Sequence, residues 1–310
     1  MFDFYFTGVD VKSPIADFLL EQPGTCLLLS QLNERTNINR WIERLKENPS
    51  HLKLFIDSGA FSAWTKGKKI DVDEYIDFIN KNKEYLTVCA SVDTIPGAPR
   101  SSVLPSEEDI KVSAEGTWQN FLYMRSKMDD VDKLLYTFHA GEPWEFLERA
   151  LTYKDERGPI NYIAFGGLVG KSGDIITKFC NKAFEIVYKH NRQDIKIHAF
   201  GMTRLNVLQE YPFTSCDSTS WLQHANYGAI AFGPTLISVS ERQNLQDRNY
   251  ANRNKAMQED LLKEIKRRGF TLEELQEDGY KRALYNVMNF YEWSTQYKCT
   301  YKLRTKPSLF

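Results

Sequence analysis

Short apolar segments alternate with amphipathic segments along the first 220 residues of the chain. Eight of them are rich in β-branched and aromatic residues and almost continuously hydrophobic, as strands buried on both faces must be. These lie at 4–9, 26–31, 53–59, 86–93, 134–141, 161–168, 195–202 and 213–219. Helical patterns lie between them, clearest at 37–49, 72–85, 117–128, 143–155 and 174–190. Eight strands alternating with helices predict an α/β fold, a (β/α)₈ or TIM barrel.

Two further segments do not belong to a bare barrel. Residues 94–115 are polar and predict a long loop after the fourth strand, and long ordered loops in compact domains are usually functional. Residues 228–241 predict a strand, a Gly-Pro turn and a second strand, with helical patterns after them. We therefore expect a catalytic barrel over 1–227 and a β-hairpin with a helical, basic-aromatic extension over 228–310, packed on the barrel.

Composition narrows the class of protein without naming a function. The 310 residues are 42% hydrophobic and 26% charged, with a formal net charge of −1, which is typical of a soluble globular protein and gives no global electrostatic argument for nucleic acid. No apolar run approaches the ~18 residues of a membrane span, and the first ten residues carry acids where a signal peptide has basic residues. We expect a cytoplasmic protein with no membrane partner; the oligomeric state stays open.

The cysteines argue against a disulfide framework and against structural zinc. They are five in number, widely spaced and without a CxxC pair. Cys26, Cys89 and Cys216 lie in strand segments, where we expect them to be small core residues.

Polar residues and glycines recur where the predicted strands end. In LFIDSGAFSAW (54–64) an apolar run stops on Asp57, and other strands end comparably. The full set is Asp57, Asp93, His139, Gly166-Gly167-Leu168, Phe200-Gly201 and Asp217. The carboxyl ends of barrel strands form the active-site mouth, so three carboxylates and a histidine are expected to converge there.

Each of these residues alone has an ordinary structural explanation. Asp57 and Asp93 fit turns or helix caps, and the Gly166-Gly167 pair fits close helix packing or a phosphate cradle. His198 lies inside a strand, where a hydrogen-bonded core histidine is expected. Asp217 is harder to explain structurally, because its surroundings are uncharged and show no capping pattern.

The ordered set resembles the motifs of the tRNA-guanine transglycosylase superfamily, whose (β/α)₈ barrel exchanges guanine for a 7-deazaguanine. The resemblance covers roughly residues 50–220, one short motif per strand. The matching segments are Asp57-Ser58-Gly59-Ala60-Phe61-Ser62, Val92-Asp93-Thr94, Thr137-Phe138-His139-Ala140-Gly141, Phe165-Gly166-Gly167-Leu168-Val169-Gly170-Lys171, Ala199-Phe200-Gly201-Met202 and Ser215-Cys216-Asp217-Ser218.

The resemblance implies a role for each matched position. Asp217 would be the nucleophile that forms a covalent glycosyl-enzyme, and Asp57 the general acid/base. Asp93 would accept hydrogen bonds from the N–H edge of the base. The remaining base-binding positions would be the backbone of Gly166, Gly167 and Leu168, His139 in place of a glutamine, the strand end at Gly201, and the stacking rings of Phe61 and Phe200.

Departures from the family pattern are also informative. The family's zinc ligands have no counterpart after Asp217, where only Cys299 follows, so we expect no metal, no cofactor and no zinc subdomain. The glycine turn ends in Lys171 instead of a glutamate, which would repel the ammonium of an aminomethyl base and favour 7-cyano-7-deazaguanine, unless Lys171 points to solvent or to a phosphate.

The pattern looks most like the DNA-directed branch of the superfamily, found in phages and bacterial DNA-modification clusters. Residues 281–310 hold six Lys or Arg against one Glu, interleaved with tyrosines, which suits a polyanion with stacked bases but also a tail packed on the barrel. We therefore expect DNA and a free 7-deazaguanine as partners, in the host cytoplasm if the protein is encoded by a phage.

Three alternatives remain at this point. One is a tRNA-guanine transglycosylase of the same mechanism. Another is a TIM-barrel glycoside hydrolase using Asp57 and Asp217, which predicts sugar-stacking tryptophans at the mouth, where only Trp64 and Trp221 qualify. The third is an inactive barrel that binds nucleic acid, against which the Asp57 and Asp217 pair argues.

Overall fold

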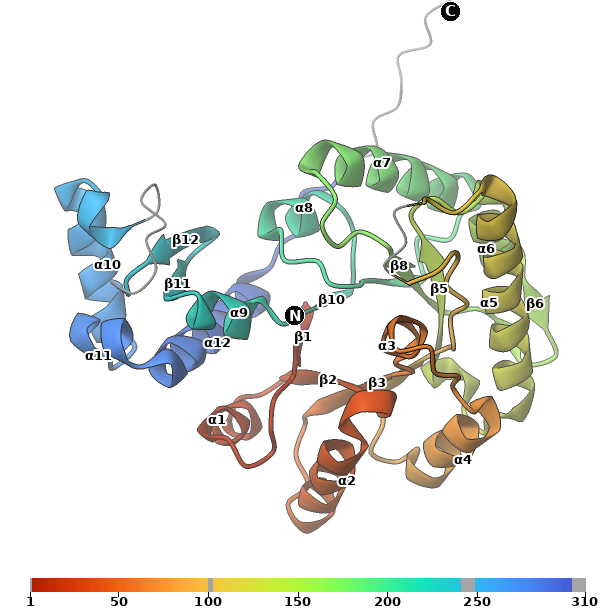
Figure 1. Cartoon of the computed structure of the whole chain (residues 1–310), viewed down its shortest axis with the longest axis horizontal. Coiled ribbons are helices and arrows are strands. Elements are labelled where there is room, and N and C mark those ends of the chain that lie inside the picture. Colours follow the sequence, from red (N-terminus) through yellow and green to blue (C-terminus); the bar gives the residue numbers. More distant parts are fainter. Residues whose placement is uncertain (1, 100–102, 241–248, 303–310) are drawn as a thin grey trace, which may run out of the picture.

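The chain forms a closed barrel of eight parallel strands in the spatial order β1-β10-β9-β8-β5-β4-β3-β2 (Figure 1). A computed structural model describes residues 2–99, 103–240 and 249–302. The strands are β1 (Asp3–Thr7), β2 (Cys26–Ser30), β3 (Lys53–Asp57), β4 (Val88–Ala90), β5 (Leu134–His139), β8 (Tyr162–Gly166), β9 (Lys196–Ala199) and β10 (Ser215–Ser218). Each overlaps one predicted segment, so the prediction of a (β/α)₈ barrel is confirmed.

Helices surround the barrel strands (Figure 1). They are α1 (Pro14–Glu21), α2 (Gln31–Glu47), α3 (Ala60–Thr65), α4 (Val72–Asn82), α5 (Glu107–Lys127), α6 (Trp144–Thr152), α7 (Gly173–Lys189), α8 (Leu205–Glu210) and α9 (Ser220–Asn226). Short additions are a 3₁₀ helix at Val131–Lys133 and the antiparallel pair β6 (Lys154–Asp155) and β7 (Gly158–Pro159). The five predicted helical segments all coincide with helices of this layer.

The expected loop over 94–115 is wrong in its second half, because α5 begins at Glu107. The Ser106 hydroxyl accepts from the backbone N–H of Asp109, and the Asp109 carboxylate accepts from the backbone N–H of Ser106. This reciprocal capping box stabilises the start of a helix. Polar composition hid it, since acidic residues favour the first helical turn as much as a loop.

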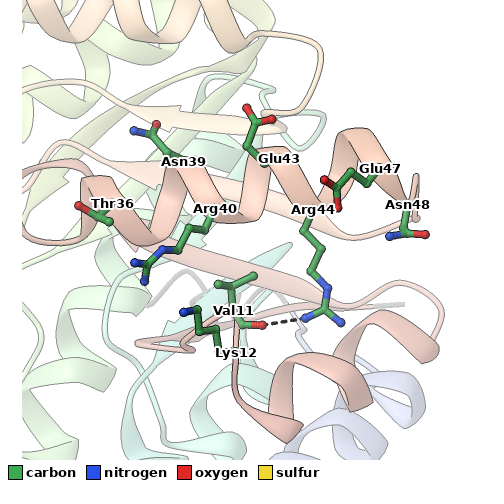
Figure 2. A pocket seen from close by; sticks show the side chains of 9 residues that line it. All are labelled: Val11, Lys12, Thr36, Asn39, Arg40, Glu43, Arg44, Glu47 and Asn48. Carbon is green, nitrogen blue, oxygen red and sulfur yellow. Dashed lines mark hydrogen bonds between the residues drawn. The ribbon is translucent and has the colours of Figure 1, made fainter.

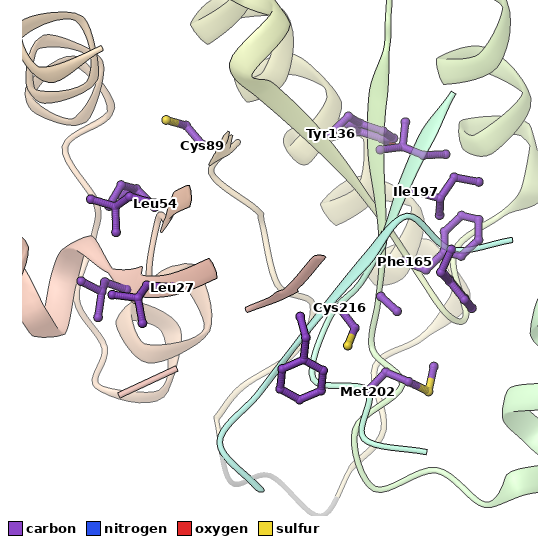
Figure 3. Packing of buried hydrophobic residues seen from close by; sticks show 14 of the residues in the cluster. Leu27, Leu54, Cys89, Tyr136, Phe165, Ile197, Met202 and Cys216 are labelled. Carbon is purple, nitrogen blue, oxygen red and sulfur yellow. The ribbon is translucent and has the colours of Figure 1, made fainter. Parts of the chain in front are cut away.

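Strand residues alternate between two apolar layers. One set, which includes Leu54, Phe165 and Ile197, belongs to a large cluster shared with the helices (Figure 3). The alternate set, which includes Phe55 and Tyr162, forms a separate small cluster. Since successive strand side chains point to opposite faces, the small cluster fills the barrel interior. Cys26, Cys89 and Cys216 are buried, which confirms them as core residues.

A β-hairpin and helices follow the barrel and lie to one side of it (Figure 1). They are β11 (Ala229–Phe232), β12 (Thr235–Ser238), a 3₁₀ helix at Tyr250–Asn252, α10 (Lys255–Arg267), α11 (Leu272–Glu277) and α12 (Gly279–Gln296). The expected hairpin and helical extension are thus confirmed as elements. α12 joins both parts: Phe290 stacks on Phe4 of β1 with ring centroids 5.0 Å apart, and Asn286 bonds to the backbone of Trp221 and Ala231. The domain boundary at residue 227 stays a prediction.

None of the helices in the described ranges is long and apolar enough to cross a membrane.

Candidate active site

The barrel topology brings the predicted polar residues to one mouth. Asp57, His139 and Gly166 are the last residues of β3, β5 and β8, and Asp217 lies one residue before the end of β10. Asp57 has the same alternation as Phe55, an interior residue, so its side chain belongs to the barrel interior. Parallel strands end at the same rim, so these four positions face a common space.

Asp57 is a carboxyl group whose surroundings disfavour its charge. Burial raises its pKa most, the negative charge of Asp93 adds to this, the backbone N–H of Gly59 opposes it, and Asp217 raises it further, to about 7. Gly59 donates to Asp57 Oδ2 at 3.0 Å. Glycine is required at this position, because its φ is +81° and a Cβ there would lie only 2.6 Å from Leu32 Cβ. Asp57 can therefore hold or release a proton near neutral pH.

Asp217 is contacted by β9 and by the loop that follows it. Its Oδ1 accepts a hydrogen bond from the backbone N–H of Gly201 at 2.7 Å and lies 3.2 Å from His198 Nε2. Gly201 has a φ of +61°, and a Cβ there would lie 2.4 Å from Val169 Cγ2, so the close approach of its N–H depends on glycine. The contacts with Gly201 and His198 fix the orientation of this carboxyl group.

A chain of buried polar groups extends from Asp217 into the barrel interior. The fully buried His198 places Nδ1 2.8 Å from Ser215 Oγ, which lies 2.6 Å from the Tyr162 hydroxyl. His198 is hydrogen-bonded in the core, as expected, but its second nitrogen contacts the candidate nucleophile. No motif in the sequence predicted that link. Its trace in the sequence is the spacing of alternate residues, which puts His198 and Ser215 in the same interior layer and in register.

His139 lies between two carboxylates. Its Nε2 is 3.2 Å from Asp93 Oδ2, its Nδ1 is 2.9 Å from Glu142 Oε1, and its backbone N–H donates to Glu142 Oε2 at 3.1 Å. Burial lowers the pKa of His139, but the charges of Asp93 and Glu142 and their hydrogen bonds outweigh it and raise the pKa to about 10. The ring is therefore an imidazolium with both nitrogens occupied. Glu142, three residues beyond the strand end, was missed in the sequence.

Asp93 has one buried oxygen without a partner. Oδ2 faces His139, whereas Oδ1 is buried and accepts no hydrogen bond from the described residues. A buried acceptor without a donor costs free energy, which a ligand N–H at this position would recover. The expected role of Asp93 fits this geometry.

The glycine turn after β8 adjoins His139. A Cβ on Gly166 would lie 2.6 Å from His139 Cδ2, so glycine leaves room for the imidazolium. Gly167 follows with a φ of +70°, which favours glycine, and Leu168 is buried. The turn is closed by hydrogen bonds from the Ala140 N–H to the Gly166 carbonyl and from the Lys171 N–H to the Leu168 carbonyl.

The two aromatic rings predicted to sandwich a base lie in different surroundings. Phe200 is partly buried at the top of the barrel interior, with its ring centroid 4.6 Å from that of His198. Phe61 is 67% exposed on α3, and its ring neighbour is Trp64, 5.8 Å away. Phe200 is thus placed beside the Asp217 cluster, while Phe61 belongs to the rim.

A cavity of about 380 Å³ opens beside Asp217. Its lining includes Lys171 and Leu168 from the loop after β8, Gly201 and Arg204 from the loop after β9, and Asp217 itself. Lys171 is therefore placed on the side of the mouth that holds the candidate nucleophile.

A second hollow, of about 570 Å³, lies on the outer face of α2, away from these residues (Figure 2). Arg44, which lines it, donates to the Val11 carbonyl and pairs with Asp17, so its charge is already engaged. None of the predicted site residues lines this hollow.

The C-terminal basic-aromatic stretch is largely packed over the part that the structure describes. The Tyr297 hydroxyl donates to the Leu208 carbonyl, and the Tyr301 ring lies 5.8 Å from that of Tyr211. Arg282 is buried and donates to the Ala225 carbonyl, while Lys281 pairs with Glu274. These side chains are not free to stack on bases or to neutralise phosphates; residues 303–310 of the stretch lie outside the described residues.

The chain offers no metal site over 2–99, 103–240 and 249–302, where no cluster of three or more His, Cys, Asp or Glu side chains could hold an ion.

Comparison with known proteins does not assign a family to this chain. No protein-family model matches it, and no curated protein matches it either.

Proposed function

We propose that this chain is a guanine transglycosylase that exchanges guanine in DNA for a 7-deazaguanine through a covalent intermediate on Asp217. The observation that carries the proposal is the pair of carboxyl groups, Asp57 and Asp217, at one mouth. Asp57 has a pKa raised to about 7, whereas Asp217 accepts a hydrogen bond at 2.7 Å from a backbone N–H. Such a pair suits a general acid/base and a nucleophile at an anomeric carbon.

The two residues would share the reaction as follows. An Asp217 oxygen bonds to C1′ of the nucleotide while the bond from C1′ to the guanine nitrogen breaks, and protonated Asp57 gives its proton to the departing base. Asp57, now a carboxylate, takes the ring N–H proton of the incoming 7-deazaguanine. That nitrogen then bonds to C1′ and releases Asp217. One base replaces the other, so no oxidant, reductant or metal is needed to balance the exchange.

Asp93 supports a guanine-like base over a sugar ring as the leaving group. Its buried Oδ1 lacks a donor among the described residues, and the N–H groups of guanine supply one. His139 is proposed to orient Asp93, because its ring Nε2 contacts Asp93 Oδ2. Phe200 offers an aromatic surface beside His198 against which a planar base can pack.

The glycoside hydrolase alternative requires tryptophans exposed at the mouth, and one of its two candidates is buried. Trp221 is only 2% exposed and donates to the Thr7 carbonyl, so it cannot stack on a sugar at the mouth. Trp64 donates to the Gly97 carbonyl and packs beside Phe61.

The experiment is base exchange by the full chain, with release of radiolabelled guanine and incorporation of the new base both measured. Separate arms use a guanine-containing deoxyoligonucleotide and a tRNA, each with 7-cyano- or aminomethyl-7-deazaguanine. We expect exchange into DNA, with the two base arms showing which 7-deazaguanine is used, and a denaturation-stable protein–DNA adduct when no free base is added. Exchange into tRNA alone would move the enzyme to the tRNA-directed class. No exchange in either arm would refute the proposed function.

A further inference from the structure

We infer that the cavity beside Asp217 is a phosphodiester site, which Lys171 and Arg204 form for the backbone flanking the reacting nucleotide. The inference deepens the proposed function and rests on it in one respect, that the sugar of the substrate reaches Asp217. It concerns the class of substrate, since free nucleosides and neutral sugars carry no such group.

The cavity is lined by two positively charged side chains, Lys171 and Arg204. Lys171 and Arg204 are both exposed, both line the cavity, and neither pairs with a carboxylate in the described part of the chain. Many other cations of the barrel have acidic partners, as Arg149 has in Glu115 and Lys189 in Glu148. Two cations without carboxylate partners among the described residues, in the hollow beside Asp217, provide the positive charge that a phosphate requires.

The guanidinium of Arg204 lies against the loop after β8. Arg204 Nη2 lies 3.4 Å from the Lys171 carbonyl, and a Cβ on Gly173 would lie 2.9 Å from Arg204 Nη1. The loop after β8 therefore holds the Arg204 head group close to the backbone of Lys171. The Arg204 guanidinium and the Lys171 backbone thus share one edge of the cavity.

Polar side chains form another part of the cavity wall. Thr203, Ser218, Thr219 and Gln223 surround the same space with hydroxyl and amide groups. Such polar groups commonly contact the phosphates and sugars of nucleic acids. A nucleotide whose C1′ lies at Asp217 has its phosphates a few bonds away, so the cavity lies where the backbone must pass.

This placement gives Lys171 a different role from selection of the incoming base. Asp93 lies in the segment after β4 and His139 ends β5, whereas the cavity with Lys171 is lined by the segments after β8, β9 and β10. We therefore expect Lys171→Gln to weaken binding of the polynucleotide and to leave the preference between nitrile and aminomethyl bases unchanged.

The test measures binding, apart from catalysis, with a fluorescent single-stranded deoxyoligonucleotide that contains one guanine, and with the matching ribo-oligonucleotide. The variants are Lys171→Gln, Arg204→Gln and Gly173→Ala, which displaces the guanidinium without a change of charge. Lys178→Gln is the matched control, an exposed lysine on α7 outside the cavity lining. Melting temperatures verify that each variant is folded.

We expect each cavity variant that loses a cation to bind roughly tenfold more weakly and to reduce the salt slope by about 0.7. Gly173→Ala should weaken binding in the same direction, and Lys178→Gln should behave as the wild type. A neutral methylphosphonate at the linkages flanking the guanine should weaken binding by the wild type more than binding by Arg204→Gln, which keeps only Lys171. The arm that binds more tightly identifies the DNA or RNA source of the phosphodiester.

The inference is overturned if the cavity variants match Lys178→Gln in affinity and salt slope, or if the methylphosphonate has equal effects on wild type and Arg204→Gln. Base exchange that persists under that result would leave the proposed function intact. Conversely, cavity-dependent binding without any base exchange would support the phosphodiester site and refute the transglycosylase.

Discussion

His198 Nε2 lies 3.2 Å from Asp217 Oδ1, the same oxygen that accepts the Gly201 N–H. Oδ1 is thus engaged from two sides, whereas Oδ2 makes no hydrogen bond with the described residues. The free oxygen is the better nucleophile, because attack through it breaks no hydrogen bond. We infer that His198 and Gly201 hold Asp217 so that Oδ2 faces the sugar.

The first prediction concerns His198 as a positioning residue. His198→Phe keeps a buried ring but removes the nitrogen that contacts Asp217, so we expect base exchange to slow by roughly 10- to 100-fold, the cost of one hydrogen bond at the carboxyl group. The KM for the free base should stay near the wild-type value, and kcat should decrease. Ser215→Ala, which breaks the contact to His198 Nδ1, is expected to give a smaller loss of the same kind. A variant whose KM rises while kcat is unchanged would contradict the positioning role.

The second prediction concerns Asp217 itself. Asp217→Ala removes the nucleophile, so exchange and the covalent protein–DNA adduct should both be lost. Binding of the oligonucleotide should be retained, since binding would draw on the other groups that line the cavity. Intact-mass spectrometry and fluorescence anisotropy measure the two properties separately. Near-normal exchange by Asp217→Ala would rule out the covalent mechanism.

Much of this fold follows from the alternation of apolar strand segments with amphipathic helical segments, which is visible in the sequence. The strand segments are apolar on both faces, so each stands out from the amphipathic helices, and the residue that ends each apolar run marks the mouth. Asp57 and Asp217 could therefore be named before the structure. The start of α5 could not, because the Ser106 capping box has the composition of a loop.

The missed site residues are those whose role depends on distant partners. His198 looks like any core histidine until β9 and β10 pair and bring Ser215 and Asp217 beside it. Glu142 looks like a loop residue until the turn after β5 folds back on His139. The tyrosines of the C-terminal stretch suggested base stacking, yet Tyr297 and Tyr301 are committed to packing on the barrel. Local pattern cannot distinguish these outcomes.

The third prediction tests the room that Gly166 leaves for His139. In Gly166→Ala the new methyl group would lie 2.6 Å from His139 Cδ2, so the ring must move away from Asp93. We expect the pKa of His139, followed by NMR titration, to fall from its raised value, and exchange to slow. The double variant Gly166→Ala with His139→Ala is the control, since the methyl group should then cost nothing beyond His139→Ala alone. If the losses of exchange rate in the two single variants added up in the double variant, glycine at 166 would be needed for the backbone conformation and not for room beside His139.

The fourth prediction is that the protein needs no metal. The described residues contain no ligand cluster, and the proposed exchange has no step that uses an ion. Treatment with EDTA should leave the melting temperature and the exchange rate unchanged. Stoichiometric zinc in the purified protein, measured by plasma mass spectrometry, would be decisive evidence against this expectation.

The last prediction is a pH dependence that comes from Asp57. Its pKa is about 7 in the folded chain, against about 4 for an unfolded aspartate, so between these values the folded state holds a proton that the unfolded state has lost. The contribution of Asp57 to the free energy of unfolding should therefore fall as pH rises from about 4 to about 7 and level off above that. Asp57→Asn should abolish this dependence, whereas Asp77→Asn, at an exposed carboxylate on α4, should keep it.

The same proton should govern the release of guanine. Departure of the base requires protonated Asp57, so single-turnover guanine release should decline above about pH 7 in the wild type. Asp57→Asn cannot transfer a proton, and its rate should be lower by roughly 10²–10⁴ and flat with pH. Quenched-flow release of labelled guanine across about pH 5 to about 9 measures both effects. If Asp57→Asn kept the wild-type rate and lost only affinity for the base, Asp57 would be a recognition residue, and the proton would have to come from elsewhere.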